Sequence, residues 1–202
     1  MIMRSIRNKR QAFKIPMIIF TVILSISLVG FFAYSPLPVE GPQVDAHVAE
    51  VQEMLKQIRR LEHGLEIEPE NEKLRASVGN RFYSLGMLYA SHGEEEVSQK
   101  YFEEAVHSYL KALEINPQLV GVRVDLATVF FYIGEHDKAE EHFKQAVNDE
   151  PSFINGLINY GIFLYAVKED REGAKEQWEN ALALNPDPLI KANIEDLLKN
   201  ID

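Results

Sequence analysis

Histidines and carboxylates are the residues whose chemistry could support metal binding or proton transfer, because the chain of 202 residues contains no cysteine. The histidines show no metal-ligand spacing, and they lie at positions 47, 63, 92, 107, 136 and 142. His136 and His142 are six residues apart and would not share one face of a helix. The carboxylates occur among lysines at helical spacing, as in Glu140 and Lys144, which is typical of a solvated helix face. We therefore expect the histidines and carboxylates to be solvated surface side chains that form no metal site.

Other signatures of catalysis are missing from the sequence as well. There is no GxxxxGK[ST] phosphate loop, no GxGxxG turn, no HExxH zinc motif and no GxSxG nucleophile turn. The lack of cysteine excludes thiolate catalysis and cysteine-ligated zinc or iron–sulfur centres. The net charge of -10 argues against nucleic acid as a partner, since phosphates require a basic face. The sequence predicts a protein that is not an enzyme and carries no cofactor.

The first 34 residues predict a membrane anchor. Residues 1–14 carry five basic residues and no acid, and residues 15–34 carry no charge. As a helix, 15–34 would span about 30 Å, the thickness of the hydrocarbon core of a bilayer. Because basic residues favour the cytoplasmic side, we expect a single-pass protein of the cytoplasmic (inner) membrane, with a cytoplasmic N-terminus and an extracytoplasmic remainder. A cleaved signal peptide is the alternative, but Phe31 and Phe32 occupy the place where cleavage requires small residues.

Two short regions separate this anchor from the rest of the chain. Residues 35–43 contain three prolines and predict a stiff, extended linker. Residues 44–69 predict an amphipathic helix whose apolar residues recur at 4-3-4-3 spacing, namely Val44, Val48, Val51, Leu55 and Ile58. This helix is expected to be a half-repeat that packs on the next hairpin, with a short dimerisation helix as the alternative.

The remaining sequence repeats itself. The phrases HSYLKALEINP, EHFKQAVNDEP and EQWENALALNP end at Pro117, Pro151 and Pro186, which are 34 and 35 residues apart. Each phrase has an aromatic residue, an alanine three positions later and a proline five positions after that. The repeat 120–153 shows the full set at standard spacing, namely Leu126, Ala127, Phe130, Gly134, Ala139, Phe143, Ala146 and Pro151. The pattern resembles the tetratricopeptide repeat (TPR) family, whose unit is a helical hairpin of 34 residues.

The resemblance implies an all-α solenoid of about three helical hairpins. The hairpins would cover 70–119, 120–153 and 154–188, with 44–69 as a leading half-repeat and 189–202 as a capping helix. The first hairpin contains 14 extra residues, seven in each half. Seven residues make two helical turns, so we expect both of its helices to be about two turns longer than the others.

Particular residues have expected places in this solenoid. The aromatic residue of each phrase, Tyr109, Phe143 or Trp178, is expected to fill the gap between adjacent repeats. The acidic run 94–96 is expected to begin the second helix of the first hairpin, where the helix dipole favours negative charge. In the capping helix, the apolar face is expected to hold Ile190, Ile194 and Leu197.

A partner-binding surface is also implied, because TPR proteins hold a peptide or protein segment on the concave surface formed by the first helix of each repeat. Alignment on the small residue places 18 positions there, and Asp125 is the one charged residue among them. The absence of basic residues argues against a clamp for a C-terminal carboxylate, and an apolar, lightly basic segment fits better. The candidate partner-binding residues are Tyr83, Met87, Thr128, Phe131, Tyr132, Asn155, Ile158, Asn159, Ile162 and Tyr165. Alternatively, neighbouring helices or the 44–67 helix cover this surface.

The expected function is that of a membrane-anchored interaction scaffold on the extracytoplasmic side. Its partners would be the lipid bilayer, through residues 15–34, and a protein or peptide segment of unknown identity. Two alternatives stay open: a permanent structural subunit of a larger membrane complex, and an accessory factor of cytochrome c maturation. The second alternative follows only from the layout, which resembles that of bacterial single-span TPR proteins.

Overall fold

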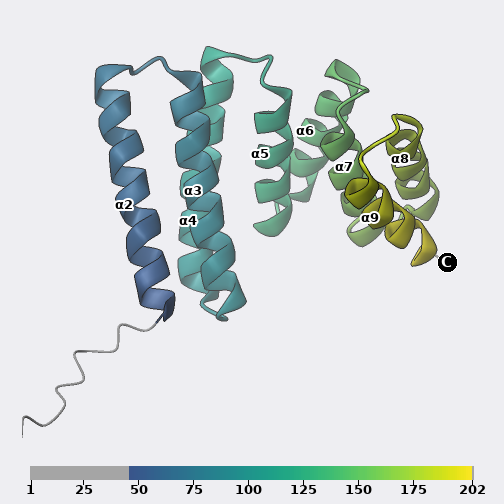
Figure 1. The fold of residues 1–202 in the computed structure, drawn as a ribbon, viewed down its shortest axis with the longest axis horizontal. Coiled ribbons are helices and arrows are strands. Elements are labelled where there is room, and N and C mark those ends of the chain that lie inside the picture. The colour runs from purple at the N-terminus through teal and green to yellow at the C-terminus, as the bar shows by residue number, and fades with distance from the viewer. Residues whose placement is uncertain (1–45, 202) are drawn as a thin grey trace, which may run out of the picture. The chain divides into compact units, whose positions relative to one another are not determined.

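The computed structural model describes residues 46–201, and every regular element in that range is an α-helix. Successive helices are joined by short turns and pack against one another in chain order (Figure 1). The helices are α2 (Ala46–Ile67), α3 (Glu72–Ser91), α4 (Glu95–Ile115), α5 (Val120–Tyr132), α6 (His136–Asp149), α7 (Ile154–Ala166), α8 (Arg171–Ala183) and α9 (Pro188–Lys199). The pairs α3/α4, α5/α6 and α7/α8 form three helical hairpins, so this part of the chain is an all-helical, TPR-like solenoid.

The predicted basic segment 1–14, membrane span 15–34 and linker 35–43 lie outside the described residues. Among residues 46–201, no helix is both long enough and apolar enough to cross a membrane.

The first hairpin has longer helices than the other two. α3 has 20 residues and α4 has 21, whereas α5 has 13 and α6 has 14, a difference of seven residues in each half. α7 and α8 have 13 residues each. This is the difference of two helical turns that the seven-residue insertions predict. Glu95 and Glu96 lie in the first turn of α4, as expected, and Gly93 supplies the positive φ of 74° that the preceding turn requires.

Within two of the hairpins, aromatic rings pack directly on glycines of the facing helix. The ring of Trp178 on α8 lies against Gly161 on α7, where any side chain would overlap it. Phe102 on α4 packs on Gly86 of α3 in the same way. The alanines at the corresponding points of the second helices, Ala105, Ala139 and Ala174, are fully buried. The small residues therefore allow close approach of the two helices of one repeat.

The aromatic residues of the three phrases are all buried, but they do not share one role. Phe143 lies between repeats, since its ring centroid is 6.0 Å from that of Tyr160 and 5.6 Å from that of Phe163 on α7. Tyr109 and Trp178 instead pack on Gly79 and Gly161 of their own hairpins. The prediction that all three rings fill the gap between repeats therefore needs correction. A glycine on the facing helix leaves space that a large ring fills within the hairpin.

α2 packs along α3, at the N-terminal end of the described solenoid (Figure 1). Val51 and Ile58 of α2 form a small buried cluster with Leu85 of α3. Val48 belongs to the same predicted seam but is 44% exposed, so the seam is buried only over part of its length.

α9 closes the other end of the solenoid. Its first turn is capped by Asp187, whose side chain accepts hydrogen bonds from the backbone N–H groups of Leu189 and Ile190 at 3.0 and 3.1 Å. Ile194 is fully buried, and Ile190 and Leu197 pack beside it against the main core. The predicted apolar face of this helix is therefore the face that covers α8.

Candidate protein-docking surface

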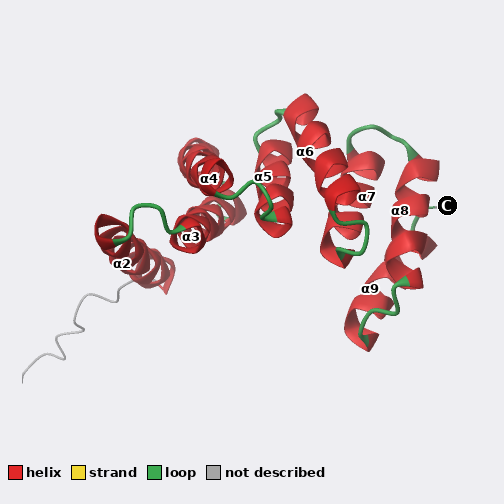
Figure 2. Ribbon diagram, turned by 90° about the horizontal axis from the view of Figure 1, so that it is seen from above, coloured by secondary structure: helices red, strands yellow, loops and turns green. Residues whose placement is uncertain are grey.

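Viewed from above, α3, α5 and α7 follow one another along one side of the solenoid, with α4, α6 and α8 on the other side (Figure 2). α5 and α7 pack against each other directly, so the first helices of successive repeats form a continuous layer. We call the solvent-facing part of this layer the first-helix surface. It consists of Asn80, Tyr83, Met87, Asp125, Thr128, Tyr132, Asn155, Asn159, Ile162 and Tyr165.

Aromatic side chains give this surface its largest exposed apolar groups. Tyr132 of α5 is 47% exposed, and its ring stacks on Phe102 of α4 with centroids 5.6 Å apart. The Tyr83 ring of α3 lies 6.1 Å from that of Tyr132, so the two tyrosines join the first and second repeats. Tyr165 of α7 is 39% exposed and lies 6.2 Å from the buried Trp178. Large rings held by packing lose little conformational entropy when a partner covers them.

Uncharged polar groups lie between these rings. The amide of Asn159 donates to the hydroxyl of Thr128 at 3.5 Å, a long contact that connects α7 with α5. The Thr128 hydroxyl itself donates to the backbone oxygen of Val124 at 2.9 Å. Asn155 is exposed one turn before Asn159. These amides can exchange hydrogen bonds with the backbone of a bound segment.

Two predicted partner-binding residues belong mainly to the packing of the solenoid. Ile158 is only 9% exposed, and its backbone oxygen accepts a hydrogen bond from the Trp178 indole at 3.1 Å. Phe131 is partly buried, with its ring 6.1 Å from Phe163 in an edge-to-face arrangement. We therefore exclude both from the first-helix surface. The other predicted residues keep partial or full exposure.

Asp125 stands out on this surface because it is charged. It lies on α5, close enough for its charge to interact with the phenols of Tyr83 on α3 and Tyr109 on α4. The carboxylate is reached by solvent, yet the surrounding helices displace part of its hydration, and this raises its pKa from the usual range to about 6. Burial also raises the pKa values of Tyr83 and Tyr109, so both phenols are neutral at physiological pH.

The N-terminal helix does not cover the first-helix surface of the second and third repeats. α2 packs against α3 through Val51 and Ile58, and Figures 1 and 2 show it at the end of the solenoid, away from α5 and α7. Within residues 46–201, the structure therefore contradicts the alternative that the 44–67 helix covers the binding surface on α5 and α7.

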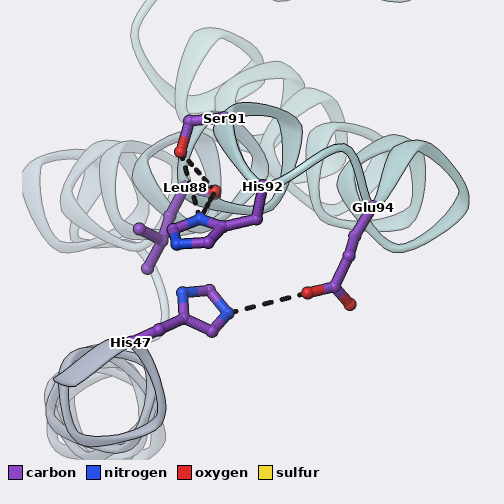
Figure 3. A network of polar contacts seen from close by, with 5 residues as sticks. All are labelled: His47, Leu88, Ser91, His92 and Glu94. Atoms are coloured by element: carbon purple, nitrogen blue, oxygen red, sulfur yellow. Dashed lines mark hydrogen bonds and ion pairs between the residues drawn. The ribbon is translucent and has the colours of Figure 1, made fainter. Parts of the chain in front are cut away.

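The structure also contains two polar arrangements that we did not predict. At the start of α2, the His47 ring lies 3.9 Å from the His92 ring, and its Nε2 is 3.7 Å from a carboxylate oxygen of Glu94 (Figure 3). Arg123 of α5 is 6% exposed and donates to the backbone oxygen of Pro117 at 2.7 Å and to Gln145 at 2.9 Å. His47 and His92 are 45 positions apart, and such a separation leaves no periodic signal.

Both arrangements hold helices in place. The His47 contacts fix the beginning of α2 on the turn between α3 and α4, while Arg123 connects the loop before α5 with α6. Within residues 46–201, no three histidine or acidic side chains are arranged to bind a metal ion.

Comparison with known proteins agrees with this architecture. A family model described as tetratricopeptide repeat matches residues 88–119, from the end of α3 to the loop that follows α4. The match covers one repeat of this chain and identifies it as a tetratricopeptide repeat. The structure of a thermophilic TPR protein from Thermus thermophilus is similar with a TM-score of 0.62 and 20% identity, over 75% of this chain and 78% of that one. That likeness shows the shared fold.

Two curated relatives match shorter stretches of the chain. One is the small glutamine-rich tetratricopeptide repeat-containing protein 2 of Mycosarcoma maydis, 29% identical over 96 residues. The other is the photosystem I assembly protein Ycf3 of Rippkaea orientalis, 26% identical over 84 residues. The matches cover 48% and 35% of this chain but only 27% and 44% of the relatives. The chain therefore spans less than half the length of either relative.

Proposed function

We propose that this TPR chain is a non-catalytic scaffold that docks an apolar segment of another protein on its first-helix surface. One observation carries the proposal: α5 and α7 expose tyrosine and amide side chains with almost no charge, in a chain that is 26% charged. Exposed apolar groups gathered on one face are typical of interaction sites. A relative whose name describes photosystem I assembly is consistent with such a role.

We further propose that residues 15–34 anchor the scaffold in the cytoplasmic membrane and that the repeats lie on the extracytoplasmic side. The support is the uncharged run 15–34 preceded by five basic residues. A C-terminal alkaline phosphatase fusion should then be active, and a C-terminal green fluorescent protein fusion should be dark. A bright fluorescent fusion would overturn this orientation.

Co-purification tests the docking proposal. The full chain is purified from its native membrane in mild detergent, as wild type and with Tyr132→Glu or Tyr165→Glu. Each substitution buries a charge against the docked segment and should reduce the recovery of a specific partner by about thirtyfold, or roughly 2 kcal/mol. A fixed stoichiometry of that partner would favour the permanent-subunit alternative over transient docking.

The matched control is a charge reversal on the opposite layer, Lys175→Glu with Glu179→Lys. This pair lies on α8 with both side chains more than half exposed and 4.0 Å apart, and the reversal keeps the pair. Partner recovery should be unchanged in the control. If the tyrosine variants retain every partner that the control retains, the proposed docking surface is wrong.

A further inference from the structure

Asp125 is the one charged residue of the first-helix surface. The groups shown to interact electrostatically with it, the phenols of Tyr83 on α3 and Tyr109 on α4, are neutral. The nearby phenol of Tyr109 on α4 donates its proton to Asn80 at 2.7 Å rather than to the carboxylate. Within residues 46–201, no hydrogen bond or ion pair satisfies Asp125.

The basic residues nearest in sequence do not compensate this charge. Arg123, two positions earlier, points to the loop at Pro117 and lies 3.7 Å from Asp149 of α6. Charged pairs of the second helices, such as Lys144 with Glu140, belong to the other layer. The folded chain therefore keeps an exposed, unpaired carboxylate on its least charged surface, where the neighbouring helices raise the free energy of its charged form.

A cation from a partner would remove this disadvantage. An ammonium or guanidinium group placed over Asp125 would form a charge-assisted hydrogen bond in partly desolvated surroundings, where such bonds are strongest. The nearby Tyr83 ring, whose centroid lies 6.1 Å from that of Tyr132, would contact the apolar stem of a lysine or arginine side chain. The surrounding uncharged surface offers no second ionic contact, so one basic residue per docked segment matches the available charge.

We propose that the docked segment is apolar and carries one lysine or arginine, which pairs with Asp125. This inference rests on the proposed docking function and adds the chemistry by which the surface selects its partner. It also makes docking sensitive to pH. The titratable groups facing Asp125 are Tyr83 from α3 and Tyr109 from α4, and both stay neutral between pH 5 and pH 8 because their pKa values are raised.

The direction of the pH effect follows from Asp125 alone. Its pKa of about 6 means that the carboxylate is charged at pH 7.5 and mostly neutral at pH 5. Affinity for a basic segment should therefore fall as the pH is lowered through about 6, whereas affinity for a purely apolar segment should not change.

Peptide selection tests this inference. A random peptide library is selected on the full chain in detergent micelles, in parallel on wild type and on the isosteric variant Asp125→Asn. The wild type should enrich apolar peptides with one lysine or arginine, and the variant should enrich apolar peptides without that preference. A selected peptide is then compared with its twin in which norleucine replaces the basic residue. Asp125→Asn should weaken the basic peptide about tenfold and leave the norleucine peptide unaffected.

The possible outcomes separate the two proposals. If wild type selects apolar peptides without a basic residue, or if norleucine costs no affinity, the pairing with Asp125 is wrong while docking stands. If the selected peptides bind equally well to the Tyr132→Glu variant and the Tyr165→Glu variant, the docking function itself is wrong, and the inference about Asp125 fails with it. Thermal unfolding of each variant shows that the protein under test is folded.

Discussion

In the second and third repeats, the two layers of the solenoid differ sharply in charge. α7 has no charged residue, and α5 has only Arg123 and Asp125. α6 and α8 have nearly the same length but are rich in lysine and glutamate at i,i+4 spacing. α5 and α7 also bury six and seven residues, whereas α6 and α8 bury three each, so packing accounts for part of this difference. A surface that only faced water would tolerate charges on either layer. The low charge of the exposed positions on α5 and α7 is what the proposed docking role predicts.

The comparison requires the two layers to pack against each other. Of the substitutions considered, Trp178→Ala should disturb this packing most and cause the largest loss of stability. Trp178 is 1% exposed, packs on Gly161 and donates to the Ile158 backbone oxygen. Its removal leaves a cavity and deletes this hydrogen bond, so we expect a loss of about 3–5 kcal/mol in the free energy of unfolding. Urea denaturation measures this loss. Trp178→Phe is the control and should lose less than half as much, because its ring still fills part of the space.

Two adjacent residues sharpen the comparison within the first-helix layer. Phe131→Ala should cost about 2 kcal/mol, since its ring is partly buried against Phe163, whereas Tyr132→Ala should cost about 0.5 kcal/mol or less. Thermal unfolding of the two variants under identical conditions measures both losses. Equal losses would show that Tyr132 belongs to the core and is not a surface residue.

Positions such as Phe131 show what the sequence could and could not predict. The 34-residue period predicted the hairpins, and insertions of seven residues predicted the two extra turns, because both depend only on helix geometry. Exposure on the first helices depends on neighbours from the next repeat or the facing helix. Ile158 and Phe131 share the spacing of surface positions, but Ile158 is only 9% exposed and Phe131 packs edge-to-face on Phe163.

Contacts between distant segments were beyond prediction for a similar reason. The pairing of His47 with His92 depends on how α2 packs along α3, which no spacing in the sequence specifies. The Glu140–Lys144 pair was expected as an ordinary solvated pair, but Lys168 from the turn before α8 joins it at 2.8 Å. The extra residue in that turn, where Glu169 has a positive φ of 53°, accompanies this contact.

Replacing Asp125, the single acid of the first-helix surface, should have a smaller effect than the substitutions above, and it should stabilise the fold instead of destabilising it. Asp125 ionises at about pH 4 in the unfolded chain and at about pH 6 in the folded one, so its charge destabilises the fold above about pH 6 and not below about pH 4. Asp125→Asn should therefore stabilise the chain at neutral pH by about 1 kcal/mol or less, because solvent still reaches the carboxylate. Thermal unfolding between pH 4 and pH 7.5 measures the difference. A destabilised variant at neutral pH would contradict an unpaired carboxylate.

The smallest expected effect belongs to the second-helix layer. Hydrogen bonds from Lys144 and then Lys168 hold the pKa of Glu140 below its usual value, so its contribution is present at neutral pH and is lost as the pH falls through that lowered pKa. Glu140→Gln should cost about 0.5 kcal/mol at pH 7, since the lysines are largely exposed. The cost should shrink in high salt. Denaturation at low and high ionic strength measures it, and a loss that salt does not change would point to packing instead of charge.

Site-specific photo-cross-linking in the native membrane tests most directly whether the first-helix surface docks another protein. A photoreactive phenylalanine derivative is placed at Tyr132, Tyr165, Lys175 or Glu179 of the full chain, one position at a time. We predict the same discrete adduct from Tyr132 and from Tyr165, its loss when the other tyrosine is replaced by glutamate, and no such adduct from the α8 positions. Adducts that form equally from α8, or that join the first-helix surface only to residues 1–45 of this chain or to a second copy, would contradict the account.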